Sequence, residues 1–113
     1  MQNLKNQKTL KILLVIPRYN GFESVDYSYI FPLGLGYISS VMKQAGYNVA
    51  VLNLNHKKGT ITDILNQWLN KQNYDVVATG HTGMGFSIVK KITDVARIHK
   101  SKPKIILGGA LIT

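Results

Sequence analysis

Glycines and polar side chains that could bind a ligand follow three apolar segments of the chain. Gly80–Gly85 (GHTGMG) holds three glycines with a histidine and a threonine, Pro17–Gly21 reads PRYNG, and Gly108–Gly109 is a glycine pair. Glycine lets backbone N–H and C=O groups approach a ligand closely. Arginine, histidine and threonine add hydrogen-bonding groups. The pattern indicates a site that holds a ligand through backbone and polar groups.

Sequence motifs of several enzyme classes are absent. The chain has no cysteine, which excludes a disulfide framework, a thiolate nucleophile and a cysteine-ligated metal centre within these residues. There is no P-loop motif, no His-x-x-x-His pair and no Ser/His/Asp set. Gly34–Ser39 (GLGYIS) is close to a dinucleotide fingerprint, but it lies far beyond the first apolar segment. We therefore expect neither a catalytic residue nor a protein-built metal site in this chain.

The chain has three histidines, and their positions differ in how well they suit contact with a ligand. His81 comes directly after the third apolar segment, where a ligand could bind, so it is a candidate contact. His56 lies in the loop after the second segment, and we interpret it as a polar loop residue. His99 has basic neighbours and is expected on a helix surface. A lone histidine is more often such a polar group than a ligand contact.

The elements that must position these residues follow from hydrophobic spacing. Short, nearly continuous apolar runs predict strands buried on both faces of a parallel sheet. They span residues 10–16, 49–54, 75–79 and 104–107. Helical spacing predicts helices over residues 33–45, from residue 61 onward, and over residues 86–99. Thr60 suits the start of the second helix, and Gly46 suits the end of the first.

Strands that alternate with helices imply parallel pairing through right-handed crossovers. The sequence therefore predicts an α/β fold with a doubly wound parallel sheet and a ligand site at the carboxyl ends of its strands. With 113 residues it forms one domain, residues 10–113, after a polar lead of residues 1–9. A domain of this kind normally continues with a further helix and strand, so we expect it to be truncated after the fourth strand.

The formal net charge is +9, from 14 Lys and Arg against 5 Asp and Glu. Most lysines are scattered, and the local cluster at Arg97–Lys104 falls at a helix end, where cations suit the helix dipole. This distribution favours a solvated face and disfavours a nucleic-acid partner. No run of about eighteen apolar residues occurs, so no membrane span is expected. The first residues lack the pattern of a secretory signal, so the cytoplasm is the expected location.

Five segments taken together in order resemble a known family. They are KILLVIPRYN at Lys11–Asn20, FPLGLGYI at Phe31–Ile38, AGYNV at Ala45–Val49, YDVV at Tyr74–Val77, and ILGG within Ile105–Gly109. The chain resembles the N-terminal cobalamin (B12)-binding domain of cobalamin-dependent radical SAM proteins. Relatives of that family include magnesium-protoporphyrin IX monomethyl ester oxidative cyclases, Fe–S oxidoreductases and methyltransferases. The resemblance covers nearly the whole chain.

The resemblance implies a flavodoxin-like, Rossmann-like fold that binds cobalamin and is not catalytic alone. It implies a longer parent protein of the methyl-transfer or oxidative-cyclisation class, in which a radical SAM domain of the same chain binds S-adenosylmethionine and a 4Fe–4S cluster. The open sheet edge could also form a homodimer. Two alternatives stay open: a degenerate interaction domain without cofactor, and a flavin or nucleotide binder of the same fold.

The resemblance also implies which residues meet the cofactor. The corrin would lie against the loop after the first strand, and the nucleotide tail would contact the loops after the third and fourth. The expected cofactor-binding residues are Pro17, Arg18, Tyr19, Asn20, Gly21, Gly80, His81, Thr82, Gly83, Gly108, Gly109 and Thr113. No histidine stands in the first of these loops, where the methionine-synthase type of domain carries its cobalt ligand.

Overall fold

The fold is an open parallel sheet of four strands. The computed structural model describes residues 10–18, 33–80 and 86–108. The strands are β1 (Lys11–Ile16), β2 (Asn48–Asn53), β3 (Val76–Gly80) and β4 (Lys104–Gly108). They pair in the order β2-β1-β3-β4, and every pair is parallel. The strand order reverses direction between β1 and β3, which is the switch point where doubly wound sheets bind ligands.

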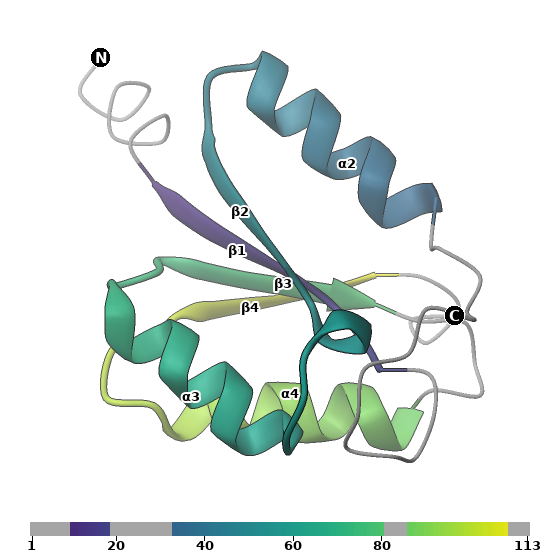
Figure 1. The fold of residues 1–113 in the computed structure, drawn as a ribbon. Helices are drawn as coiled ribbons and strands as arrows, with labels where there is room; N and C mark the ends of the chain where they lie inside the picture. Colours follow the sequence, from purple (N-terminus) through teal and green to yellow (C-terminus); the bar gives the residue numbers. More distant parts are fainter. Residues whose placement is uncertain (1–9, 19–32, 81–85, 109–113) are drawn as a thin grey trace.

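Helices cover both faces of the sheet (Figure 1). Helix α2 (Leu33–Gln44) connects β1 to β2 and packs on one face. Helices α3 (Ile61–Lys71) and α4 (Phe86–Ile98) lie side by side on the other face. A short 3-10 turn, η1 (Leu54–His56), follows β2 directly. This arrangement confirms the predicted α/β class with a doubly wound, flavodoxin-like sheet.

The helix ends follow from local chemistry. Thr60 precedes α3 in an extended conformation, and its hydroxyl accepts a hydrogen bond from the backbone N–H of Asp63 at 3.1 Å. This is the predicted N-cap, which satisfies one of the helix's first N–H groups. Gly46 ends α2 at a φ of 94°. That left-handed conformation favours glycine, and the N–H groups of Gly46 and Tyr47 donate back to the last turn of the helix.

The main core lies between the sheet and the pair α3–α4. It contains fully buried side chains from β1, β2, β3 and both helices: Leu13, Val15, Leu52, Leu65, Leu69, Val77 and Ile92. Alternate residues of β1 face the other layer, yet they are equally buried. In a strand that is buried on both faces, neither set of alternate side chains faces water, which explains the continuous apolar sequence of β1.

Helix α2 covers its face of the sheet incompletely. It contacts β2 and β1, while Tyr37, Ile38 and Val41 on the helix remain exposed. On β4, Ile106 is also exposed, at 57% of its surface. On α2, the polar residue Ser39 is buried while these apolar residues of the helix are exposed. The apolar side of α2 therefore does not coincide with its buried side.

One sequence expectation about a helix surface is wrong. His99 is buried, with 7% of its surface exposed, and lies just beyond the end of α4. Its Nδ1 lies 2.7 Å from the Ser101 hydroxyl and its Nε2 lies 2.7 Å from Asn70 Oδ1. The basic sequence neighbours of His99 suggested that its ring faces solvent. In the fold the ring is placed beside Asn70 of α3, a partner that is distant in the sequence.

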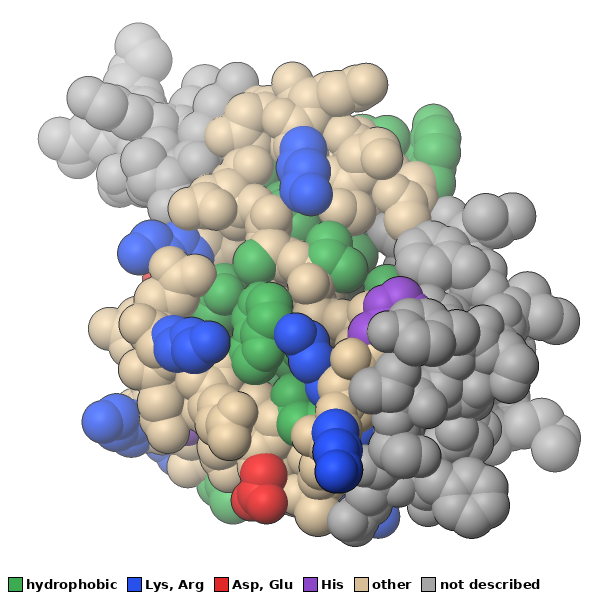
Figure 2. Space-filling model, viewed as in Figure 1, with side chains coloured by type: hydrophobic (Ala, Val, Ile, Leu, Met, Phe, Trp, Pro, Cys, Tyr) green, Lys and Arg blue, Asp and Glu red, His purple; other side chains and the backbone are tan. Residues whose placement is uncertain are grey.

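The basic side chains do not gather into one large patch on the face viewed in Figure 2, where lysine and arginine side chains lie apart from one another. In the described part of the chain, no helix is both long and apolar enough to cross a membrane.

Candidate functional site

The carboxyl ends of the four strands lie at one edge of the sheet, on the right in Figure 1. Register places Asn53 of β2 beside Ile16 of β1, and Gly80 of β3 beside Gly108 of β4. The buried hydroxyl of Thr79 donates a hydrogen bond of 2.8 Å to the carbonyl oxygen of Val15. This bond ties β3 to β1 at the switch point, where a ligand would meet the sheet.

Two glycines that are register partners, Gly80 and Gly108, end β3 and β4. A Cβ atom added at Gly80 would lie 2.6 Å from the carbonyl oxygen of Gly108 and 2.9 Å from its carbonyl carbon. Both atoms are backbone, so a side chain at Gly80 would force the strands apart. A Cβ atom added at Gly108 meets nothing within 4 Å. Gly80 is therefore required by strand packing, whereas Gly108 borders open space.

Arg18, directly after Pro17 at the end of β1, is the most unusual residue of this edge. It is buried, with 3% of its surface exposed. Its guanidinium donates to three carbonyl oxygens of the loop after β2: Leu54 at 3.1 and 3.3 Å, Lys57 at 2.6 Å and Gly59 at 2.6 Å. Burying a cation costs several kcal/mol unless strong hydrogen bonds replace its hydration. Here the N–H groups of the planar guanidinium donate to three backbone carbonyl oxygens at once.

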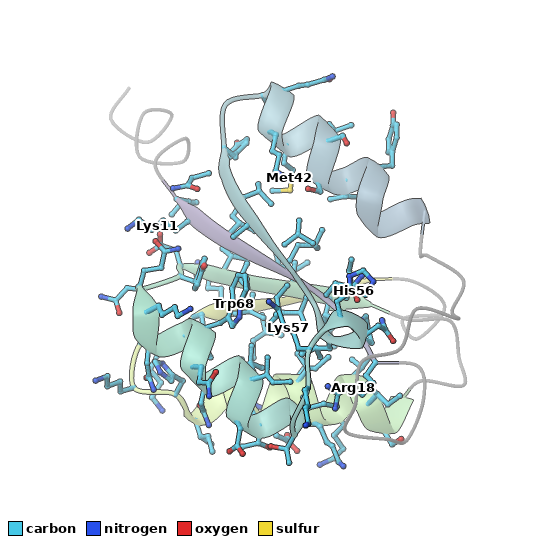
Figure 3. The ribbon with its side chains drawn as sticks, in the orientation of Figure 1. Lys11, Arg18, Met42, His56, Lys57 and Trp68 are labelled. Carbon is cyan, nitrogen blue, oxygen red and sulfur yellow. The ribbon has the colours of Figure 1, made fainter. Side chains whose placement is uncertain are left out.

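Asn55 makes a second buried connection between the same two strand ends. Its side chain is fully buried, and its amide nitrogen donates to the Pro17 carbonyl oxygen at 2.8 Å and to Asn53 Oδ1 at 3.0 Å. Asn53 Oδ1 also accepts from the backbone N–H of Asn55 at 3.0 Å. Arg18 and Asn55 together fix the loop of residues 54–60, which we call the β2–α3 loop, against the end of β1 (Figure 3).

The structure places four of the predicted cofactor-binding residues. Pro17 and Arg18 lie at the end of β1, Gly80 at the end of β3 and Gly108 at the end of β4, all at the same edge. The other predicted residues lie outside the described part of the chain: Tyr19, Asn20, Gly21, His81, Thr82, Gly83, Gly109 and Thr113. The edge predicted from the strand order is therefore formed.

Sequence reasoning missed the connection between the first strand end and the β2–α3 loop. Asn55 is 38 residues from its partner Pro17, and asparagine in a loop is typical of an ordinary turn. Arg18 was assigned to a ligand, while its described hydrogen bonds go to loop carbonyls. No local pattern identifies these contacts, because they depend on β1 and β2 lying side by side.

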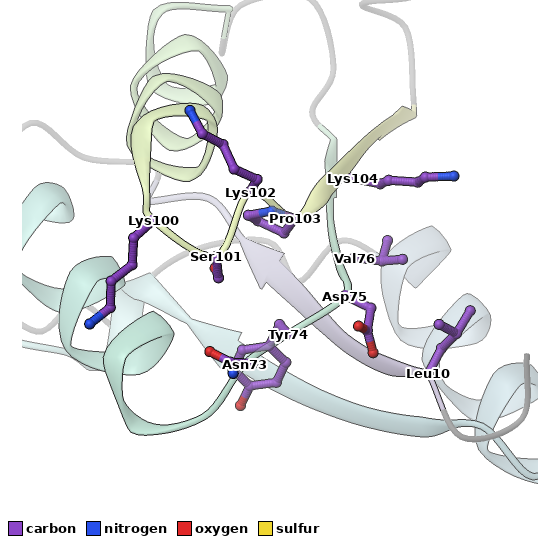
Figure 4. A pocket seen from close by; sticks show the side chains of 10 residues that line it. All are labelled: Leu10, Asn73, Tyr74, Asp75, Val76, Lys100, Ser101, Lys102, Pro103 and Lys104. Atoms are coloured by element: carbon purple, nitrogen blue, oxygen red, sulfur yellow. The ribbon is translucent and has the colours of Figure 1, made fainter. Parts of the chain in front are cut away.

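A cavity of about 780 Å³ lies at the opposite, amino-terminal edge of the strands. Its lining includes Tyr74, Asp75, Lys100, Lys102 and Lys104. Figure 4 shows the three lysine side chains pointing in different directions, so they do not converge on one anion. Asp75 Oδ2 accepts the backbone N–H of Lys11 at 2.9 Å, a structural contact between the start of β1 and the residue before β3. The carboxyl edge remains the stronger candidate site.

Comparisons with known proteins agree with this fold. The family model for the B12 binding domain matches residues 24–113. A comparison with curated proteins found no match. Among solved structures, the fold is similar to that of the radical S-adenosylmethionine methyltransferase TsrM from Kitasatospora setae, solved with tryptophan substrate and a SAM analog bound.

The likeness to this methyltransferase has a TM-score of 0.63 at 18% sequence identity. It covers 89% of the present chain but only 19% of the methyltransferase chain. At this identity the likeness supports the fold. The present chain spans about a fifth of the length of that structure, so the remainder of the methyltransferase has no counterpart in these residues.

Proposed function

The chain belongs to the B12-binding domain family, and from this premise we propose that it binds cobalamin at the carboxyl edge of its sheet. The observation that carries the proposal is the glycine pair Gly80–Gly108 beside the switch point of a B12-binding fold. Gly80 is buried at the end of β3, and the space beside its register partner Gly108 at the end of β4 is open. Bare backbone can meet the peripheral amides of a broad, fairly apolar macrocycle at close range.

The residues present fit such a group. Thr79 and Gly80 hold β3 against its neighbours, which keeps the open backbone of the edge in place. Arg18 and Asn55 hold the adjoining β2–α3 loop, which forms a rigid flank of the edge. When bound, cobalamin supplies a cobalt centre for group transfer, and the protein contributes orientation and shielding. The proposed contacts of the loops after β1, β3 and β4 are those of the candidate residues named above.

The wider setting is also a proposal. We infer that the chain serves a larger radical SAM protein as its cofactor-binding module, together with a domain that binds S-adenosylmethionine and a 4Fe–4S cluster. The structural likeness to a radical SAM methyltransferase of much greater length supports this. Methyl transfer is the better supported class, since the similar structure is a methyltransferase. A homodimer through the free edge of β4 and a cytoplasmic location stay predictions.

Retention of cobalamin on a desalting column tests the proposal. The 113-residue chain is mixed with hydroxocobalamin, passed over the column, and the protein fraction is scanned for visible absorbance. We expect the corrin bands to co-elute with folded protein and to be lost when the protein is unfolded in urea. A parallel mixture with FMN is the control for the fold's other common ligand. Corrin bands found only in the small-molecule fraction contradict the proposal, and retained FMN would assign a flavin site instead.

A further inference from the structure

The amino-terminal edge of the sheet carries positive charge that the described acidic residues do not neutralise. Helices α3 and α4 end at this edge and β4 begins there, on the left in Figure 1. Five exposed cations at these positions form what we call the basic edge: Lys71, Arg97, Lys100, Lys102 and Lys104. In the described part of the chain, the one ion pair joins Lys90 to Asp94 on α4, so no member of the basic edge is paired with an acid.

Acidic groups are scarce around the basic edge. Asp75 is its one acidic residue among those described, and the Oδ2 atom of Asp75 accepts the backbone N–H of Lys11. Residues 1–9, which lead into β1, contain two lysines and no Asp or Glu. Cations in the last turn of a helix suit its dipole, which accounts for the members in α3 and α4. Lys102 and Lys104 lie beyond the last turn of α4, so the helix dipole does not account for them.

Hydrogen bonds hold the turn that carries Lys100 and Lys102. His99 is buried at the start of this turn, with its Nε2 2.7 Å from Asn70 Oδ1 on α3 and its Nδ1 accepting the backbone N–H of Ser101 at 3.2 Å. The N–H of Lys102 donates to the His99 carbonyl oxygen at 3.0 Å. Lys102 has a φ of 50°, a left-handed conformation that favours glycine, yet the position holds a lysine. The two lysine side chains therefore extend from a fixed backbone.

The surface beside this turn is hollow. The cavity of about 780 Å³ at the amino-terminal edge is bordered by Lys100, Lys102 and Lys104. Figure 4 shows their side chains pointing in different directions around it, an arrangement that suits an extended group better than one small anion. Exposed charges attract opposite charge over about 8 Å at physiological salt. A protruding segment with several carboxylates can therefore meet all three lysines at once.

An exposed apolar side chain beside the basic edge favours a protein as the partner. Ile98, the last residue of α4, has 78% of its surface exposed and follows Arg97 directly. An apolar centre with a polar, charged rim is the usual composition of a protein interface. Nucleic acids favour several arginines and exposed aromatic rings, whereas the described part of this edge has a single arginine and its Tyr74 is buried. A lipid surface needs a wider apolar face than one isoleucine.

We propose that the basic edge and Ile98 dock a protein partner, whose acidic segment enters the cavity and whose apolar residue covers Ile98. This surface lies at the opposite end of the strands from the proposed cobalamin site, so a docked partner leaves that site open. The inference therefore concerns a second binding surface and does not depend on cobalamin being bound.

Fluorescence anisotropy of two labelled peptides, titrated with the 113-residue chain, tests this inference. One peptide is rich in glutamate with a central leucine, and the other has serine in place of that leucine. Lys100→Glu/Lys104→Glu is expected to raise the Kd of both peptides roughly 10-fold, because two attractions become repulsions. Ile98→Ser is expected to raise the Kd of the leucine peptide alone, roughly 3- to 10-fold, because only that peptide has an apolar residue to bury.

Lys58→Glu/Lys91→Glu is the matched control, because it changes the net charge equally at exposed positions away from the basic edge. Lys58 lies in the β2–α3 loop at the opposite edge, and Lys91 lies in the first half of α4. We expect this variant to keep both Kd values within about twofold of the unsubstituted chain. Far-UV circular dichroism and the urea midpoint verify that every variant folds.

Equal weakening by the two double variants would overturn the inference, since it would show attraction by net charge alone. Failure of the unsubstituted chain to bind either peptide, or an unchanged Kd of the leucine peptide in Ile98→Ser, would overturn it as well. So would tighter binding of duplex DNA, or of vesicles of equal parts phosphatidylserine and phosphatidylcholine, that is lost in Lys100→Glu/Lys104→Glu. Every variant is expected to retain cobalamin, so the proposed function is tested separately.

Discussion

Replacing Arg18 with methionine is expected to lower the free energy of unfolding by about 3 kcal/mol. Methionine keeps an apolar stem but removes every donor of the guanidinium. The Leu54 carbonyl then loses its charged partner in a buried position, where the lost hydrogen bond cannot be replaced by solvent at low cost. The Lys57 and Gly59 carbonyls are only part-buried, so turning toward water recovers some of their loss.

Urea unfolding followed by circular dichroism measures this change. Lys58→Met is the control, because Lys58 is exposed on the same loop and its replacement is expected to shift stability by less than about 0.5 kcal/mol. Arg18→Lys is expected to fall between the two, since one ammonium cannot reach three carbonyls as a planar fork does. An Arg18→Met protein as stable as the Lys58→Met protein would show that the buried hydrogen bonds do not hold the loop.

Gly80→Ala is expected to cost about 2–3 kcal/mol of stability, because the added methyl group collides with the backbone of the neighbouring strand. The added Cβ would lie 2.6 Å from the Gly108 carbonyl oxygen, and no side-chain rotation relieves a contact between a Cβ and backbone. The β3–β4 pair must shift, and the carboxyl edge shifts with it. We therefore expect weaker cobalamin binding in addition to weaker folding.

Gly108→Ala supplies the matched control for this substitution. It makes the same chemical change at the register partner of Gly80, but its added Cβ meets nothing within 4 Å. Thermal or urea unfolding of the two variants should therefore separate them clearly, with Gly108→Ala close to the unsubstituted chain. Equal losses in both variants would mean that the cost comes from glycine's backbone freedom and not from the close approach of the strands.

Most of the fold was predictable because local signals decide it. The continuous apolar run of β1 indicated a strand buried on both faces, and Thr60 and Gly46 marked helix ends that the structure confirms. The strand β2 ends one residue earlier than predicted, since Leu54 begins the η1 turn. Asn53 caps that turn with its side chain, a contact that apolar spacing cannot anticipate.

The candidate site was predictable only in part. The positions of its strand ends follow from the topology of the sheet, whereas the hydrogen bonds that hold the adjoining loop do not. Parallel strands determine that the carboxyl ends meet at one edge, so the positions of Gly80 and Gly108 follow from their strand ends. The hydrogen bonds of Arg18 to Leu54 and of His99 to Asn70 connect segments that are distant in the sequence. Such contacts depend on which elements become neighbours, and a basic or polar residue in isolation indicates solvent.

Chemical-shift mapping of cobalamin on the isotope-labelled chain tests most directly that the cofactor binds at the carboxyl edge. Hydroxocobalamin contains diamagnetic cobalt(III), so backbone amide signals can be followed through a titration. The account predicts the largest shifts at the strand ends, at Asn53–His56, Thr79–Gly80 and Gly108, with little change at the opposite edge around Tyr74 and Lys102. Shifts concentrated at that opposite edge, or none at any strand end, would contradict it.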